Sequence, residues 1–167
     1  MEMLKIRTEP LTALDRLAIG IATAAGVGFI PKAPGTAGSV VGVLLYVLIQ
    51  WLELSAYYPH VIIFVLITGT WASSRVEYLY GHDSQRIVID EVAGQMITFA
   101  WAAGKFHLPV FDIAAGFLLF RLFDIVKPFP LRRLEACRGG LGVVADDVGA
   151  GLYAMLALAL IRYGLGA

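Results

Sequence analysis

The residues of this sequence most able to do chemistry are acidic side chains inside apolar segments. Asp90 and Glu91 occur in IVIDEVAGQM, Asp124 in FRLFDIVKPFP, and Asp146 and Asp147 in ADDVGAG. Carboxylates in such surroundings cost free energy and are usually paired or functional. Several carboxylates in one pocket would repel one another unless a cation neutralised them, and Mg²⁺ favours oxygen ligands. We therefore predict a magnesium site with ligands among these five acids.

Some of these acids also have a purely structural interpretation. Asp146 and Asp147 could cap the helix expected after them, since carboxylates stabilise helix N-termini. Arg121 and Asp124 are three residues apart and could form an ion pair on one helix face. The two acids of IVIDEVAGQM are harder to explain in this way, because we expect them about one turn inside a helix. Function is favoured there.

A Gly/Pro-rich segment, PKAPGTAGS at Pro31–Ser39, is a candidate phosphate site. Its small residues expose backbone N–H groups, and Thr36 or Ser39 can cap the helix expected after it. The segment lacks the GxxxxGK(S/T) pattern of nucleotide-binding loops, so no nucleotide partner is implied. Arg121 and Lys127 are further candidates for holding a phosphate group. An ordinary interfacial turn is the alternative interpretation of the segment.

The remaining reactive side chains are weaker candidates. His82 and Asp83 lie in a polar loop and could assist proton transfer, although a lone loop histidine is more often solvated. Arg132 and Arg133 could lie among anionic lipid headgroups or serve only to orient the chain in a membrane. Cys137 is the single cysteine, which excludes an internal disulfide and a cysteine-rich zinc site.

The composition indicates a membrane protein. Of the 167 residues, 59% are hydrophobic and 16% are charged, whereas soluble domains have roughly 45–50% apolar and about 25% charged residues. The formal net charge is zero, which gives no electrostatic argument for a nucleic-acid partner. The charged N-terminal segment lacks the pattern of a cleaved signal peptide.

The elements that must position the acids are predicted to be membrane-spanning helices. We expect an all-α, polytopic helical bundle with about five transmembrane helices. A Gly/Ala-rich stretch at Leu17–Ile30 is too short to cross easily and is expected to be re-entrant or interfacial. The five expected spans are Val40–Ala56, Val61–Ser74, Ile87–Ala103, Val110–Val126 and Asp147–Tyr163.

The distribution of basic residues predicts the orientation. If the N-terminus is cytoplasmic, 11 of the 13 Lys and Arg residues lie in cytoplasmic regions or helix ends, leaving Lys105 and Arg162 outside. The same orientation places the Gly/Pro-rich segment, all five acids and the basic loop at the cytoplasmic face. Chemistry concentrated on one face favours a surface reaction over transport through the bilayer.

Four motifs in order, PGTAGS, HDS…IVIDEVAGQ, FRLFDIVKPFP and DDVGAG, resemble the phosphatidylglycerophosphatase A family. The resemblance runs from about Phe29 to Gly151. It implies one membrane-embedded phosphatase domain over residues 1–167, with 1–16 as a cytoplasmic N-terminal segment. It also implies a magnesium-dependent enzyme of the bacterial inner membrane that converts phosphatidylglycerophosphate to phosphatidylglycerol and phosphate. The oligomeric state is left open.

The resemblance also implies roles for matched residues. The acids Asp90, Glu91, Asp124 and Asp147 are the expected catalytic residues, and Asp146 joins them as a metal ligand. The matched phosphate-binding residues are Thr36, Ser39, Arg121 and Lys127, and the HD pair His82 and Asp83 matches a motif position. Water activated by the metal is the expected nucleophile.

Two other function classes remain as alternatives. A proton- or cation-coupled transporter could use intramembrane acids, but the outer halves of the expected spans are nearly all apolar or aromatic. A non-enzymatic scaffold could use the small residues to pack helices, but it would not need five acids at one depth.

The expected topology can be tested with reporter fusions. A reporter at Ala167 should report the periplasmic side, because an odd number of spans follows a cytoplasmic N-terminus. A reporter within Gly139–Gly142 should report the cytoplasmic side. Finding Tyr57–His60 and Gly139–Gly142 on the same side would contradict the orientation.

Overall fold

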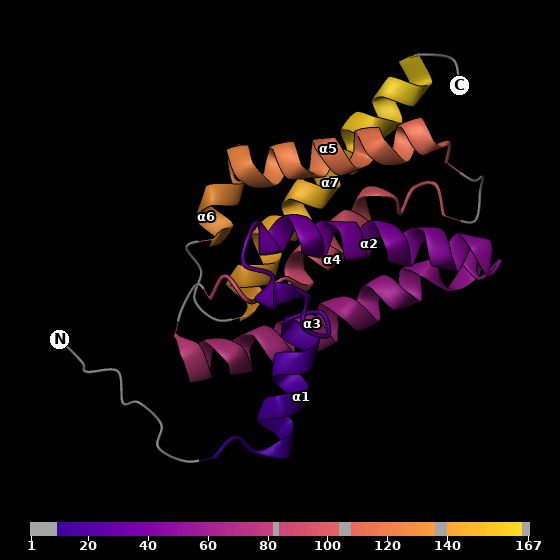
Figure 1. The fold of residues 1–167 in the computed structure, drawn as a ribbon. Helices are drawn as coiled ribbons and strands as arrows, with labels where there is room; N and C mark the ends of the chain where they lie inside the picture. Colours follow the sequence, from indigo (N-terminus) through magenta and orange to yellow (C-terminus); the bar gives the residue numbers. More distant parts are fainter. Residues whose placement is uncertain (1–9, 82–83, 104–107, 136–139, 165–167) are drawn as a thin grey trace.

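A computed structural model describes residues 10–81, 84–103, 108–135 and 140–164, and all regular structure among them is helical. The all-α prediction is confirmed for this part of the chain, whereas His82 and Asp83 lie outside the described residues. The elements, drawn in Figure 1, are α1 (Ala13–Ala22), η1 (Val27–Phe29), α2 (Pro34–Trp51), η2 (Ser55–Tyr57), α3 (Tyr58–Tyr80), α4 (Ile89–Thr98), α5 (Val110–Val126), α6 (Leu131–Glu135) and α7 (Gly140–Gly164).

The first helix is fixed at its start by a capping box. Thr12 accepts a hydrogen bond from the Asp15 N–H, and the Asp15 carboxylate accepts from the Thr12 N–H and hydroxyl. These hydrogen bonds lower the pKa of Asp15 to about 2. Arg75 of α3 donates to the same carboxylate at 2.8 Å. The ion pair therefore ties α1 to α3.

The short helix α4 forms the centre of the molecule. It packs against α2, α3, α5 and α7, and Figure 1 shows it behind α2 and beside α7. Nine of its ten residues are buried. This helix is enclosed along its length even though four of its ten residues are polar, namely Asp90, Glu91, Gln95 and Thr98.

Glycines allow the neighbouring helices to approach α4 closely. A Cβ at Gly151 of α7 would lie 2.4 Å from the carbonyl oxygen of Gly94, and a Cβ at Gly42 of α2 would lie 2.8 Å from the carbonyl oxygen of Val92. Neither position has room for a side chain. The backbones of α2 and α7 can therefore pack directly against the backbone of α4.

An aromatic cluster closes the C-terminal end of α4. Phe99, the residue that ends this helix, packs on Tyr46 with 4.8 Å between ring centroids, and Tyr46 meets Tyr58 at 5.5 Å. All three side chains are buried. The Tyr58 hydroxyl donates to the carbonyl oxygen of Met96 at 2.7 Å, an acceptor in the last turn that also receives the Phe99 N–H.

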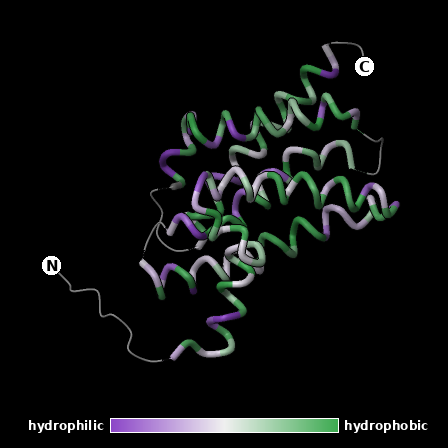
Figure 2. Tube along the Cα trace, in the orientation of Figure 1, coloured by the Kyte–Doolittle hydropathy of each residue, from purple (hydrophilic) through white to green (hydrophobic). Residues whose placement is uncertain are grey.

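The outward faces of the long helices are apolar. Large hydrophobic side chains such as Leu44, Phe64, Leu118 and Leu156 are more than half exposed, and Figure 2 shows hydrophobic residues along most of each long helix. By length and composition, α2 and α7 could cross a membrane. Exposed apolar faces of this extent are expected where lipid is the solvent.

The helix boundaries differ from the predicted ones in several places. The predicted span Ile87–Ala103 contains only the ten-residue α4, about 15 Å long, which cannot cross a hydrocarbon core of about 30 Å. Both α2 and α7 begin about two turns earlier than predicted. The stretch Leu17–Ile30 contains the end of α1 and the short η1. The number of spans, and whether the segment that contains α4 crosses together with the residues after it, stay predictions.

Substituting Gly151 tests the close packing of α7 against α4. Gly151→Ala should lower the free energy of unfolding by about 1–3 kcal/mol, because the added methyl group has no space. Gly20→Ala is the matched control, since nothing lies within 4 Å of its Cβ position. It should leave the free energy unchanged or raise it slightly. Thermal unfolding in detergent, followed by circular dichroism, measures both. Equal midpoints for the two variants would contradict the packing argument.

Candidate active site

A cavity of about 740 Å³ lies where the N-terminal ends of α2 and α4 meet α5 and α7. We call it the acid cavity. It brings together segments that are far apart in the sequence, and all five predicted acids line it. The lining residues are Ala33, Pro34, Gly35, Ser84, Gln85, Ile87, Asp90, Glu91, Arg121, Asp124, Lys127, Arg132, Val143, Asp146 and Asp147.

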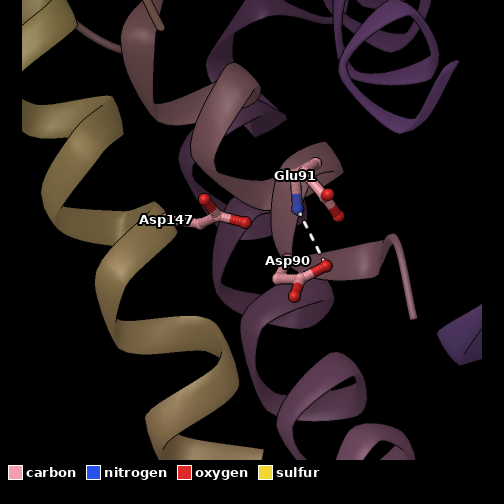
Figure 3. A group of neighbouring side chains, drawn as sticks. All are labelled: Asp90, Glu91 and Asp147. Carbon is pink, nitrogen blue, oxygen red and sulfur yellow. Dashed lines mark hydrogen bonds between the residues drawn. The ribbon is translucent and has the colours of Figure 1, made fainter. Parts of the chain in front are cut away.

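Three of the acids form a tight group in this cavity. One carboxylate oxygen each from Asp90, Glu91 and Asp147 lies within 4.8 Å of the others. Figure 3 shows Asp147 reaching from α7 toward the first turn of α4. The Glu91 N–H donates to Asp90 Oδ1 at 3.1 Å. A group of this size and composition could hold a metal ion.

Two oxygens of this group are buried without a hydrogen-bond partner among the described residues. They are Oε2 of Glu91 and Oδ1 of Asp147. Burying an ionised carboxylate without a partner costs several kcal/mol, and three such groups also repel one another. A cation that accepts oxygen ligands would compensate both costs, so the donor set fits a divalent metal.

The structure corrects the predicted positions of these acids on their helices. Asp90 and Glu91 are the second and third residues of α4, not one turn inside a helix. Both carboxyl groups therefore lie beside the positive end of the helix dipole. Asp146 and Asp147 are the seventh and eighth residues of α7, so neither caps that helix. The interpretation of Asp146 and Asp147 as helix caps is therefore wrong.

The two remaining acids are paired with basic side chains. Arg121 contacts Asp124 at 2.7 Å, and Lys127 contacts Asp146 at 2.6 Å. The ion pair predicted as an alternative for Arg121 and Asp124 is therefore present. These pairs hold two cationic groups on the cavity wall, while Asp124 and Asp146 stay outside the three-acid group.

The Gly/Pro-rich segment contributes differently from what was predicted. Ala33, in a left-handed conformation, precedes α2, so Thr36 and Ser39 lie inside the helix and cap nothing. Ser39 is buried, donates to the Gly35 carbonyl oxygen at 3.0 Å and accepts from Arg121 at 3.4 Å. Ser39 thus helps to orient the guanidinium, but neither Ser39 nor Thr36 lines the cavity.

Several cavity residues were missed by sequence reasoning. Ser84, Gln85 and Arg132 line the cavity, although Arg132 was expected among lipid headgroups. Gly35 matters for space: a Cβ there would lie 2.1 Å from Oε1 of Glu91. The sequence shows a glycine at this position within PGTAGS. Only the close approach of α2 to α4 shows that its lack of a side chain makes room for Glu91.

Comparisons with known proteins show which family the chain resembles. Residues 20–162 match the family described as phosphatidylglycerophosphatase A. A Bacteroides thetaiotaomicron protein with the provisional name phosphatidylinositol-3-phosphatase is 38% identical over 90% of this chain and 96% of its own length. No solved structure shows significant similarity to the chain.

Two further relatives carry the family's name. The phosphatidylglycerophosphatase A of Haemophilus influenzae is 34% identical over 92% of this chain and 91% of its own length. That of Escherichia coli is 33% identical over 81% of this chain and 76% of its own length. The match covers every residue that lines the acid cavity. The chain belongs to the phosphatidylglycerophosphatase A family.

Proposed function

We propose that this protein is a magnesium-dependent phosphatase that hydrolyses phosphatidylglycerophosphate to phosphatidylglycerol and phosphate. The observation that carries the proposal is the group of Asp90, Glu91 and Asp147, whose oxygens lie within 4.8 Å in a cavity that also holds basic side chains. Family membership supports a lipid phosphatase and gives no support to the transporter alternative. We place the enzyme in the bacterial inner membrane, as a multi-pass protein with the cavity at the cytoplasmic face.

The three-acid group would hold the magnesium ion. Its unpartnered oxygens on Glu91 and Asp147 supply hard ligands, and the size of the cavity leaves room for water. When bound, the ion would polarise the phosphoryl group and lower the pKa of a water molecule that attacks phosphorus. The protein's part is to keep three carboxylates together at the buried start of α4, where water from the membrane face can enter.

The basic side chains would bind the phosphate oxygens. Arg121 and Lys127 are hydrogen-bond donors only, so they attract phosphate where carboxylates repel it. Asp124 and Asp146 hold these two donors against the wall, and Ser39 adds a second contact to Arg121. We therefore assign Asp124 and Asp146 to positioning the donors. Backbone N–H groups at the start of α2, beside Gly35, can add to the phosphate site.

The two lipids named for the relatives share a chemical feature that suggests the substrate class. Phosphatidylglycerophosphate and phosphatidylinositol 3-phosphate each carry a terminal phosphomonoester on a headgroup that a phosphodiester joins to diacylglycerol. The apolar outer faces of the helices would keep the acyl chains in the bilayer while the headgroup enters the acid cavity. We take phosphatidylglycerophosphate as the substrate, because the family and two of the three relatives are named for it.

Replacing Asp90 tests the metal role. Asp90→Asn keeps the shape of the side chain and removes one charge from the three-acid group. It should lower the rate of phosphate release from phosphatidylglycerophosphate by about 10²–10³, the usual cost of losing one electrostatic contribution at a reacting centre. It should also raise the Mg²⁺ concentration needed for half-maximal activity. Phosphate release in detergent micelles across a Mg²⁺ series measures both.

Asp112→Asn is the matched control for this experiment. Asp112 pairs with Arg162 and does not line the acid cavity, so this variant should keep the wild-type Mg²⁺ midpoint. Parallel assays with phosphatidylinositol 3-phosphate test the other named lipid. Near-normal turnover of Asp90→Asn, or equal Mg²⁺ shifts in the two variants, would contradict the metal assignment.

Gly35 offers a second test that leaves every ligand in place. Gly35→Ala puts a methyl group 2.1 Å from Oε1 of Glu91, the end of a side chain that can rotate away. The protein should therefore fold with nearly unchanged stability, while its Mg²⁺ midpoint rises and its rate falls by about 10-fold or more. Unfolding and Mg²⁺ titration on the same preparation separate the two effects. An unchanged midpoint would show that Glu91 need not contact the metal.

A further inference from the structure

A second hollow of about 570 Å³ adjoins the acid cavity. Pro34, Ser84 and Gln85 line both spaces, so the two lie side by side. The second space contains no acidic side chain among the described residues, and its charged group is Arg86. We call it the arginine hollow. A ligand that fills the acid cavity can extend into it without leaving the protein.

Arg86 is held by aromatic rings in this hollow. Its guanidinium carbon lies over the Phe29 ring at 5.7 Å from the centroid and over the Tyr80 ring at 5.6 Å. Cation–π contacts engage the face of the guanidinium and leave its N–H edge able to bind an oxyanion with two hydrogen bonds. The side chain is therefore prepared for an anion.

The backbone beside Arg86 is also fixed. A Cβ at Gly28 would lie 2.0 Å from the Arg86 carbonyl oxygen, so the turn after α1 packs directly on this residue. Two residues later, the Val88 N–H donates to the Ala22 carbonyl oxygen at 2.9 Å. The end of α1 and η1, which contribute nothing to the three-acid group, thus position Arg86.

We propose that the arginine hollow binds the phosphodiester of the lipid substrate, and that Arg86 is a specificity-determining residue. The inference rests on the proposed function, in which the terminal phosphomonoester occupies the acid cavity. The phosphodiester keeps a negative charge throughout the reaction. The guanidinium in the adjoining space would attract this charge.

The rim of the hollow fits the part of the lipid that follows the phosphodiester. Phe29 and Ile30 are 54% and 45% exposed. Apolar side chains at this edge can contact the glycerol backbone and the first carbons of the acyl chains. The order from acid cavity to Arg86 to apolar rim therefore matches the order of monoester, diester and acyl chains in the substrate.

Kinetics with two lipids test the assignment. Phosphatidic acid carries a phosphomonoester directly on diacylglycerol and has no phosphodiester. In nonionic detergent micelles, Arg86→Gln should raise the KM for phosphatidylglycerophosphate by about 10- to 100-fold, the usual loss for a hydrogen-bonded charge, and change kcat little. The inhibition constant of phosphatidic acid, measured as a competitor, should stay the same. Arg86→Lys should recover part of the affinity.

Arg133→Gln is the matched control. Arg133 also stacks on a phenylalanine ring, Phe129, at 4.8 Å, but it lines neither space. It should leave both constants unchanged. An unchanged KM in Arg86→Gln, or equal weakening of both lipids, would overturn the proposal, the latter pointing to general lipid attraction or misfolding. If the wild-type protein releases no phosphate from the lipid, the proposed function fails instead.

Discussion

The mutual repulsion of buried carboxylates is the constraint on which the rest of the structure depends. Asp90, Glu91 and Asp147 come from two helices and meet inside an apolar bundle. Such a group persists only if surrounding elements force it together and if positive charge compensates it. The start of the α4 dipole supplies part of that charge, and the proposed metal ion supplies the rest. The neighbouring ion pairs keep Asp124 and Asp146 from adding to the repulsion.

Close helix packing provides the force that holds the acids together. Without side chains at Gly42, Gly94 and Gly151, backbone meets backbone at the crossings of α4 with α2 and α7. At such close helix crossings the dispersion contacts are dense, so the helices have little freedom to slide past one another. The same glycines that look like scaffold features in the sequence therefore fix the distance between Asp147 and the first turn of α4.

The sequence predicted which acids come together better than it predicted the helix boundaries. Apolar context was enough to single out the acids, because few other roles justify a carboxylate there. The predicted helix boundaries were wrong where hydropathy does not change between a helix and the turns after it. Ile87–Ala103 is apolar enough for a membrane span, but its helix ends at Thr98. The pairing of Lys127 with Asp146 and the contact of Ser39 with Arg121 join residues 19 and 82 positions apart. Pairings of that kind depend on tertiary packing, which no local pattern encodes.

The aromatic cluster beyond α4 has a consequence for the bilayer itself. An enzyme that admits water and ions to a buried charged site risks opening a leak through the membrane. Here the acid cavity touches α4 only at its first turn, while the rings of Tyr46, Tyr58 and Phe99 pack together at the other end. Hydrated ions cannot pass such a plug without losing their water, which costs far more than thermal energy. In the proposed membrane orientation, this packed end of α4 would separate the acid cavity from the opposite side of the bilayer.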